Sequence, residues 1–365
     1  MYNIALISFS NNYDMQKYVF SLYESLKEKY KGKIVTLTSQ KTYFDINYDD
    51  NNFFINVPKR PGLEFKTFNF FEIKKIIKVL KSKRIDLIYF LSSHVWNIFL
   101  INTLKKYGVK IIHSIHDPIP HEGEKDSNNV RIYNKYISKK SDIVILHSEK
   151  LKIPFIKTYS ISNTKVKVIP LWHEWKPFHK IEQNKNKVLF FGRINPYKGV
   201  ENIIELAKLN NNIIFDIVGK ISKKLEHLKI ELKKYKNINL VDEYVDEYTM
   251  DKFFYDNQIT ILPYNSATQS GVVVESYRHS RPIIGFNVGA ISEQVPLEFR
   301  DFFLLESGDI IALNNTLKKY LNLSIKEKNY ICKAFYDYGF NKFSVLKASE
   351  FFLQLIRNIE IDERR

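Results

Sequence analysis

The residues ITILPYNSATQSGVVVE, positions 259–275, decide how this chain is interpreted. The apolar run from Ile259 to Leu262 predicts a buried strand, and the small polar residues after it predict a turn lined with hydroxyl and backbone N–H groups. A helical pattern resumes at Gly271 and carries one carboxylate, Glu275. Because the first turn of a helix has unpaired N–H donors and the positive end of the helix dipole, this junction is suited to binding an anion.

A second junction of the same kind lies earlier in the chain. The residues VLFFGRINPYKG, positions 188–199, place Gly192, Arg193, Lys198 and Gly199 between an apolar run and the next helical pattern. Arginine offers a planar fork to phosphate oxygens, and lysine offers a mobile point charge. The two junctions together predict a pocket for a diphosphate. The alternative for the two cations is ordinary surface charge.

Length and composition restrict the class of protein. A chain of 365 residues is long enough for two domains with substantial cores. Its 44% hydrophobic and 15% aromatic content exclude a disordered protein. Cys332 is the one cysteine, which fits a reducing compartment, and we expect it in the core. The chain has no run of 18 uncharged apolar residues and does not open with a signal-peptide pattern, so we expect a cytoplasmic protein.

The net charge of +16 is distributed unevenly. Residues 1–180 contain 30 Lys and Arg against 16 Asp and Glu, whereas residues 181–365 contain 26 against 24. A general lysine bias would act on both halves alike, so the first half is expected to meet an anionic surface. Anionic lipid, an anionic acceptor and nucleic acid all fit. Specific nucleic-acid binding is not expected, because no recognised binding module or aromatic–basic repeat accompanies the charge.

The helix expected at residues 70–84 carries part of this charge. Its lysines, at positions 74, 75, 78 and 81, share one face, and its apolar residues, at positions 70, 73, 76, 77 and 80, share another. This helix could lie on an anionic membrane surface. It could equally be an ordinary crossover helix with a solvated basic face and an apolar side packed on the sheet.

A candidate site residue of the first half follows the strand expected at 109–115. Ligands of an open parallel sheet bind outside the carboxyl ends of its strands, so we expect His116 at a site, with Asp117 beside it. His113, inside the strand, is expected in the core. His121 is either a second ligand contact or a loop residue. Residue types allow a metal site from His116, Asp117 and His121, but no regular spacing supports it, and we predict no metal.

Strands and helices alternate along both halves, which predicts an α/β protein with two doubly wound parallel sheets. The segment 45–61 is predicted to be a polar loop. The expected strands are residues 3–9, 34–38, 86–91, 109–115, 143–146, 166–169, 188–191, 213–218, 238–241 and 258–262.

An ordered set of motifs resembles the donor half of the family-4 glycosyltransferases, whose two Rossmann-like domains form the GT-B fold. The resemblance is detailed over residues 187–300 and extends in outline to the whole chain. It implies an acceptor-side domain at 1–170, a hinge at 171–186, a donor-binding domain at 187–342 and a terminal helix, 343–365, that packs back on the first domain. The motifs are Gly192-Arg193, Lys198-Gly199, Thr268-Gln269-Ser270-Gly271-Val272, Glu275, Pro282-Ile283-Ile284 and Gly289-Ala290-Ile291-Ser292-Glu293.

The resemblance implies a UDP- or GDP-sugar donor and gives roles to the donor-side residues. Arg193, Lys198 and the amides around Ser270 to Val272, beside Gly192, would stabilise the departing diphosphate. Glu275 would accept hydrogen bonds from the ribose, and Thr268 and Gln269 would lie near the sugar or phosphates. No two aspartates are separated by one residue, so we expect a metal-independent enzyme without a cofactor.

On the acceptor side, the resemblance implies that His116 faces the reacting sugar. The expected reaction moves a hexose to a glycan acceptor, expected to be lipid-linked, with retained configuration, in the synthesis of surface polysaccharide or lipopolysaccharide. The enzyme would lie in the cytoplasm, peripheral on the inner face of the membrane. The alternative is a non-catalytic GT-B glycan-binding or partner subunit.

The sequence departs from the family pattern at two places. The loop after the first strand reads Ser8-Phe9-Ser10-Asn11-Asn12, where relatives usually have glycines, and Ala267 stands where many relatives have an acidic residue that contacts the transferred sugar. These departures leave the acceptor side and the identity of the sugar open.

Overall fold

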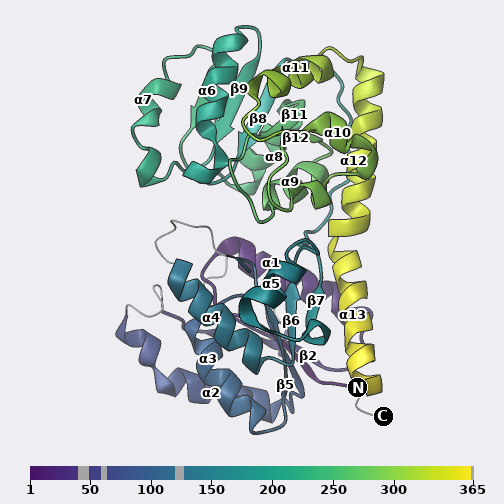
Figure 1. Ribbon diagram of the computed structural model, residues 1–365. Coiled ribbons are helices and arrows are strands. Elements are labelled where there is room, and N and C mark those ends of the chain that lie inside the picture. Colours follow the sequence, from purple (N-terminus) through teal and green to yellow (C-terminus); the bar gives the residue numbers. More distant parts are fainter. Residues whose placement is uncertain (40–48, 59–63, 120–126, 363–365) are drawn as a thin grey trace. The chain divides into compact units, whose positions relative to one another are not determined.

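The computed structural model describes residues 1–39, 49–58, 64–119 and 127–362. It divides into two compact units, one comprising Met1–Trp172 and Val345–Arg365 and the other His173–Ser344 (Figure 1). Each unit has one parallel sheet with helices packed against it, as the alternating pattern predicts. In the described part of the chain, no helix is long and apolar enough to span a membrane.

The sheet of the first unit has seven strands within the described residues, in the order β3-β2-β1-β4-β5-β6-β7, and every pairing is parallel. The chain order reverses between the neighbours β1 and β4, and ligands of doubly wound sheets bind at such a switch point. The strands are β1 (Ile4–Ser8), β2 (Ile34–Ser39), β3 (Asn52–Ile55), β4 (Leu87–Phe90), β5 (Lys110–Ser114), β6 (Ile143–Leu146) and β7 (Val166–Val168).

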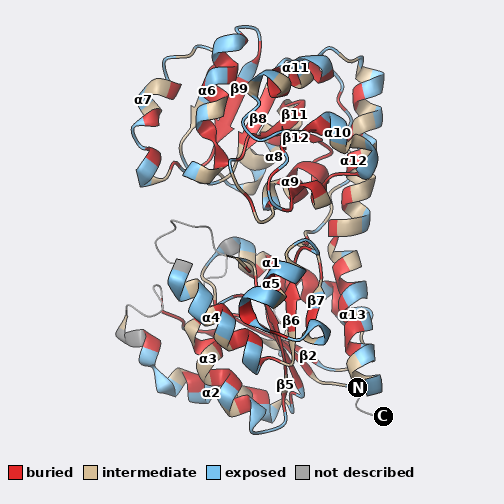
Figure 2. Cartoon of the chain, in the orientation of Figure 1, coloured by how far each residue is buried: buried red, intermediate tan, exposed pale blue. Residues whose placement is uncertain are grey.

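Helices cover both faces of this sheet, so its strands are buried on both sides (Figure 2). Along β1, Ala5 and Ile7 pack with α2, α3 and α4, while Ile4 and Leu6 pack with α1 and α13. The helices are α1 (Tyr13–Lys27), α2 (Phe70–Ser82), α3 (Val95–Lys105), α4 (Ser127–Lys140), α5 (Lys152–Tyr159) and α13 (Val345–Asp362).

The last helix, α13, belongs to the core of the first unit. Its Phe352 ring stacks on Tyr89 of β4 with ring centroids 5.0 Å apart. Ser25 of α1 donates a hydrogen bond of 2.9 Å to Ser349 of α13. The C-terminal segment therefore completes the face of the sheet that α1 covers.

The second unit contains six parallel strands in the order β10-β9-β8-β11-β12-β13 within its described residues. Here the order reverses between β8 and β11, so the junctions after these two strands lie side by side at the switch point. The strands are β8 (Lys187–Phe191), β9 (Ile214–Val218), β10 (Ile238–Val241), β11 (Ile259–Leu262), β12 (Ile283–Phe286) and β13 (Leu304–Leu305). The helices are α6 (Val200–Leu209), α7 (Leu228–Leu232), α8 (Glu247–Asp256), α9 (Gly271–Arg278), α10 (Arg300–Phe303), α11 (Ile310–Leu321) and α12 (Ile325–Phe343).

Two local predictions are wrong. Strand β3 lies inside the segment expected to be a loop, where Asn52–Ile55 pairs with β2 at the edge of the sheet. Phe70, expected on the buried face of α2, is more than half exposed, because it opens the helix one turn before the packed residues Ile73 and Ile76. His113 and Cys332 are fully buried, which confirms the expectation that both are core residues.

Candidate functional site

The two junctions singled out in the sequence meet at the switch point of the second unit. Gly192 follows β8 with a φ of +92°, and a Cβ built on it would lie 2.8 Å from the Lys198 ammonium and 3.3 Å from a methyl of Val272. A side chain here would collide with that ammonium and would be strained by the backbone conformation. Gly192 therefore places the Lys198 charge beside the first turn of α9.

Backbone contacts join the two loops on the other side of this point. Gly199 has a φ of +63°, and its Cβ would lie 2.1 Å from the carbonyl oxygen of Pro263. That carbonyl accepts a 2.9 Å hydrogen bond from the Asn202 amide, and the Asn265 N–H donates to the Tyr197 carbonyl at 2.8 Å. The loops after β8 and β11 thus form one connected surface.

Lys198 is a buried cation with no carboxylate beside it among its described hydrogen bonds. The side chain is 6% exposed, and its ammonium donates to the Phe191 carbonyl at 3.2 Å and lies 5.4 Å from the centre of the Tyr264 ring. Burial, and then the nearby charge of Arg193, lower the pKa of Lys198 to about 7. Arg193 is itself exposed. The site therefore has an electrostatic preference for an anionic ligand, which would relieve both effects.

The loop residues Thr268 and Gln269 are half-buried and lead into α9, whose first residue is Gly271. The Ser270 hydroxyl does not cap the helix. The Ser270 N–H donates instead to the side chain of Gln294 at 2.8 Å. Helix geometry leaves the next N–H groups, of Gly271 and Val272, without acceptors inside the helix, so these amides and the dipole face an approaching anion.

Glu275 is paired with Arg278 and lies beside His173, and neither of these residues was predicted at the site. One nitrogen of Arg278 lies 3.1 Å from each carboxylate oxygen of Glu275, and His173 Nε2 lies 3.3 Å from one of them. The other terminal nitrogen of Arg278 pairs with Glu247 at 3.2 Å. Burial opposes the Arg278 charge, but the two carboxylates raise its pKa. The (i, i+3) spacing of Glu275 and Arg278 could have revealed this pair, whereas Glu247 and His173 come from distant segments.

The first unit presents a different group of residues at the carboxyl end of β5. His116 is half-buried, and its Nε2 lies 2.7 Å from the Leu91 carbonyl, so Nε2 carries the proton and Nδ1 is the acceptor of the neutral ring. The centres of the His116 and His147 rings lie 4.6 Å apart. Burial lowers the pKa of both histidines. Asp117 has an exposed side chain, and its carbonyl accepts from Asn134 at 2.9 Å.

The structure therefore brings the predicted site residues into two groups, one in each unit. Gly192, Lys198 and Val272 converge directly, and Arg193 acts on Lys198 through its charge. His116 and Asp117 form the group of the first unit. His121, considered as a further ligand contact, lies outside the described residues. His147 was not predicted at the site, although it directly follows β6 of the same sheet.

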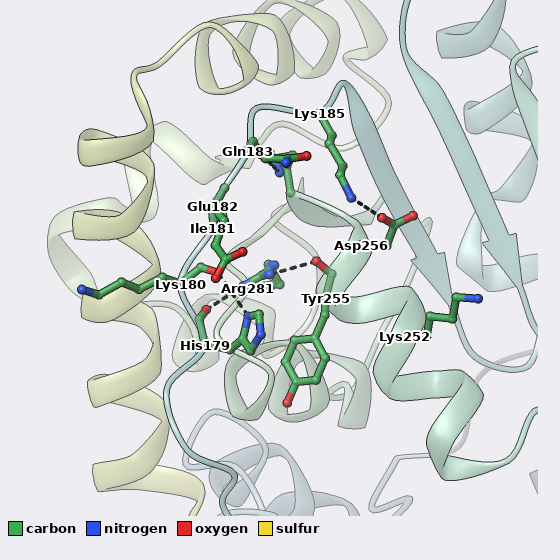
Figure 3. Close-up of a pocket in the computed structure, with 11 residues that line it drawn as sticks. His179, Lys180, Ile181, Glu182, Gln183, Lys185, Lys252, Tyr255, Asp256 and Arg281 are labelled. Carbon is green, nitrogen blue, oxygen red and sulfur yellow. Dashed lines mark hydrogen bonds and ion pairs between the residues drawn. The ribbon is translucent and has the colours of Figure 1, made fainter.

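A pocket of about 450 Å³ lies elsewhere in the second unit and contains none of the predicted site residues (Figure 3). Its wall includes Arg281, which is buried and donates hydrogen bonds to the carbonyls of Asn257, His179 and Tyr255. These bonds fasten the segment around His179 to the end of α8. Arg281 therefore has a structural role in this wall of the pocket.

Comparisons with known proteins identify the family and the fold. The family model of the glycosyl transferases group 1 matches residues 173–335, and that of Glycosyltransferase Family 4 matches residues 15–172. The matches meet between Trp172 and His173, where the structure divides into its units. An uncharacterized 41.2 kDa protein in the cps region of Klebsiella pneumoniae is 24% identical over 60% of this chain, and the match spans 65% of that relative, less than two thirds of its length.

Solved structures share the fold over 78% to 99% of the chain. Sucrose-phosphate synthase from Thermosynechococcus elongatus is 16% identical with a TM-score of 0.77, covering 99% of this chain and 100% of that one. HepE from Anabaena, in complex with UDP and glucose, is 14% identical with a TM-score of 0.73, covering 98% and 100%. TarM from S. aureus is 16% identical with a TM-score of 0.62, covering 78% and 58%. The chain belongs to the family-4 glycosyltransferases, and its two units have the GT-B fold.

Proposed function

We propose that this protein is a glycosyltransferase that moves a hexose from a UDP- or GDP-sugar to a glycan acceptor. The observation that carries the proposal is the convergence at Gly192, whose Cβ position would lie 2.8 Å from a buried ammonium and 3.3 Å from a methyl in the first turn of α9. A diphosphate can bind to both groups, because it brings negative charge to the ammonium and oxygen acceptors to the amides.

The chemistry of the donor assigns the residues their roles. Cleavage of the anomeric C–O bond leaves a nucleoside diphosphate that gains negative charge. Lys198, Arg193 and the amides of Gly271 and Val272 stabilise that charge without a metal ion. The Glu275 carboxylate accepts hydrogen bonds from the ribose hydroxyls, while Thr268 and Gln269 contact the sugar or phosphates. His116 faces the reacting sugar, with Asp117 beside it, and the anomeric configuration is retained.

The acceptor is a glycan, lipid-linked, in the synthesis of surface polysaccharide or lipopolysaccharide. The relative from Klebsiella pneumoniae, a protein in a cps region, supports the part of this proposal that concerns polysaccharide synthesis. The structures of HepE with UDP and glucose, and of TarM with UDP and GlcNAc-glycerol, support the UDP-sugar as the donor to test first.

The first unit docks on an anionic membrane at the cytoplasmic face through α2. At the start of this helix Phe68, Phe70 and Phe71 are more than half exposed, and Lys74 and Lys78 are exposed behind them. Exposed aromatic rings beside lysines suit the headgroup region of an anionic bilayer. Binding to anionic liposomes should fall when the lysines at 74, 75, 78 and 81 are changed to Glu. Undiminished binding would contradict this role for α2.

The donor is tested by thermal shift with UDP, GDP, ADP and CDP, followed by hydrolysis assays with the matching nucleotide-sugars. UDP or GDP should raise the melting temperature, and hydrolysis should persist in EDTA. If no nucleoside diphosphate stabilises the wild-type chain, the proposal fails.

A non-catalytic GT-B partner subunit is the second candidate, because Ala267 replaces an acidic residue that contacts the sugar in many relatives. In that case the biological function would survive Arg193→Ala and Lys198→Ala. An enzyme would lose its activity in both variants.

A further inference from the structure

The side chain of Gln294 pairs with both polar backbone groups of Ser270. The Ser270 N–H donates to Gln294 Oε1 at 2.8 Å, and Gln294 Nε2 donates to the Ser270 carbonyl at 3.0 Å. Both residues are 5% exposed. The two hydrogen bonds pair both polar backbone groups of Ser270, the residue immediately before α9, and so hold the backbone where it enters the helix.

The segment around Gln294 is itself held from the other side. The carbonyl of Glu293 accepts hydrogen bonds from the Tyr338 hydroxyl at 2.7 Å and from the Lys342 ammonium. The Val295 carbonyl accepts from Arg300 Nε at 3.1 Å. Because its two neighbours are fixed, Gln294 is a rigid support for Ser270.

A close backbone approach adds a second point of support at the start of the same loop. Gly289 has a φ of +53°, and its Cβ would lie 1.5 Å from the Ala267 carbonyl oxygen. The loop from Ala267 to Ser270, which carries Thr268 and Gln269, is therefore supported by the 289–295 segment at both ends.

We propose that Gln294 is a positioning residue of the donor site and acts through Ser270. It holds the 268–272 backbone so that the amides of Gly271 and Val272 meet the diphosphate beside Lys198. This inference rests on the proposed function. Misplacing such donors by about 1 Å can lower a rate about a hundredfold, so the support matters although Gln294 does not contact the ligand.

The chemistry of the amide makes the role testable. An amide offers a donor and an acceptor side by side without charge, methionine offers neither in a similar volume, and a carboxyl offers both only when it is protonated. Gln294→Met therefore removes the support. Gln294→Glu keeps an acceptor for the Ser270 N–H but loses the donor to the Ser270 carbonyl at high pH, and it regains that donor when the new carboxyl takes up a proton.

Gln258 provides a matched control in the same unit. It is 3% exposed, its Nε2 donates to the Gln183 carbonyl at 3.1 Å, and it lies in the wall of the pocket of Figure 3. Gln258→Met also removes a buried side-chain amide, but the hydrogen bond that it loses to the Gln183 carbonyl involves neither Ser270 nor α9. We expect it to lower stability without changing the donor kinetics.

The experiment measures kcat and KM for the nucleotide-sugar, together with amide hydrogen exchange at Ser270 without ligand. Gln294→Met should lower kcat/KM about 10- to 100-fold and speed exchange at Ser270, while Gln258→Met does neither. Gln294→Glu should retain more activity than Gln294→Met, and its rate relative to the wild type at the same pH should rise as the pH is lowered and the new carboxyl takes up a proton.

Unchanged Ser270 exchange and unchanged kinetics in Gln294→Met would overturn the proposal. Equal losses in Gln294→Met and Gln258→Met would overturn it too, because general destabilisation would then explain both. The exchange measurement needs no ligand. A wild-type chain that binds no nucleoside diphosphate would therefore end the proposed function, while the exchange data would separately decide whether Gln294 supports Ser270.

Discussion

The carboxyl edges of the two parallel sheets differ in charge, although both sheets follow the same doubly wound plan. In the first unit this edge carries hydroxyls, such as Ser8 and Ser92 with oxygens 2.8 Å apart, and histidines whose pKa burial lowers, such as His116 and His147. In the second unit it carries the buried ammonium of Lys198.

The net charge of the sequence is distributed in the opposite way. Residues 1–180 hold an excess of 14 positive charges, from 30 Lys and Arg against 16 Asp and Glu, whereas residues 181–365 hold an excess of 2. Net charge therefore indicates which surface attracts an anionic partner. It does not locate the candidate site, where a buried ammonium with no carboxylate among its described hydrogen bonds lies near the first turn of α9.

Lys198→Met tests this contrast with the largest expected effect. Removing the ammonium should lower the transfer rate about 10²- to 10³-fold, as loss of one preorganised donor typically does. The same variant should melt at a higher temperature below pH 7, since a buried charge with a lowered pKa opposes folding. Initial rates and thermal melts measure the two effects.

Lys208→Met is the control for Lys198→Met, because Lys208 is exposed and pairs with Glu205 at 2.8 Å on the surface of α6. It should change neither rate nor melting temperature appreciably. If Lys198→Met keeps more than a tenth of the wild-type rate, Lys198 is not the principal cation of the donor site.

Arg278→Met should have the next largest effect. It leaves the carboxylates of Glu275 and Glu247 without their shared cation, and breaking a buried pair by removing one partner costs about 3–5 kcal/mol of unfolding free energy. Denaturant unfolding checks the loss, and the KM for the donor should rise about tenfold because Glu275 loses its orientation. A variant as stable as the wild type would show that solvent already screens this pair.

Acid should weaken the first unit before the second. Burial lowers the pKa of His94 to about 4 and of His113 to about 3, so the unfolded chain binds these protons more tightly than the folded chain. Their contribution to stability is present above the ordinary histidine pKa of 6.5 and is lost as the pH falls toward 3. Lys198 affects stability in another pH range. The destabilisation caused by its buried charge is complete below pH 7 and disappears as the pH rises toward 10.5.

Hydrogen exchange between pH 7 and 4 measures this difference. Amides of β4 and β5 should lose protection as the pH falls, while those of β8 and β11 change less. The NMR signals of the His94 and His113 rings provide a second check, since neither ring should titrate between pH 8 and 5. An equal loss of amide protection in both sheets would contradict the prediction that acid weakens the first unit before the second.

Local pattern was sufficient to predict the strand–turn–helix junctions at 188–199 and 259–275, because each combines a buried apolar run with glycines and a resuming helical period. Strand β3 was missed because Asn52–Ile55 is short, half-buried and at the edge, so it has little alternation to detect. The α/β class itself follows from the alternation of strands and helices.

Contacts between distant segments could not be predicted. Gln294 supports Ser270 from 24 residues away, and nothing in either local pattern indicates the pair. The low pKa of Lys198 depends on its burial and on the nearby charge of Arg193, and only the packed loops reveal that burial. By contrast, Arg278 lies three residues after Glu275 and could have been recognised from helical spacing.

The most direct test of the account is the proton balance when the wild-type chain binds UDP or GDP, measured by calorimetry at pH 8 in buffers of different ionisation enthalpy. A diphosphate at Lys198 should raise the lowered pKa of that ammonium, so binding should take up close to one proton, and the affinity should weaken as the pH rises above 7. Lys198→Met should abolish the uptake. Binding with no proton uptake, or uptake that persists in Lys198→Met, would contradict the claim that Lys198 and the first turn of α9 hold the diphosphate.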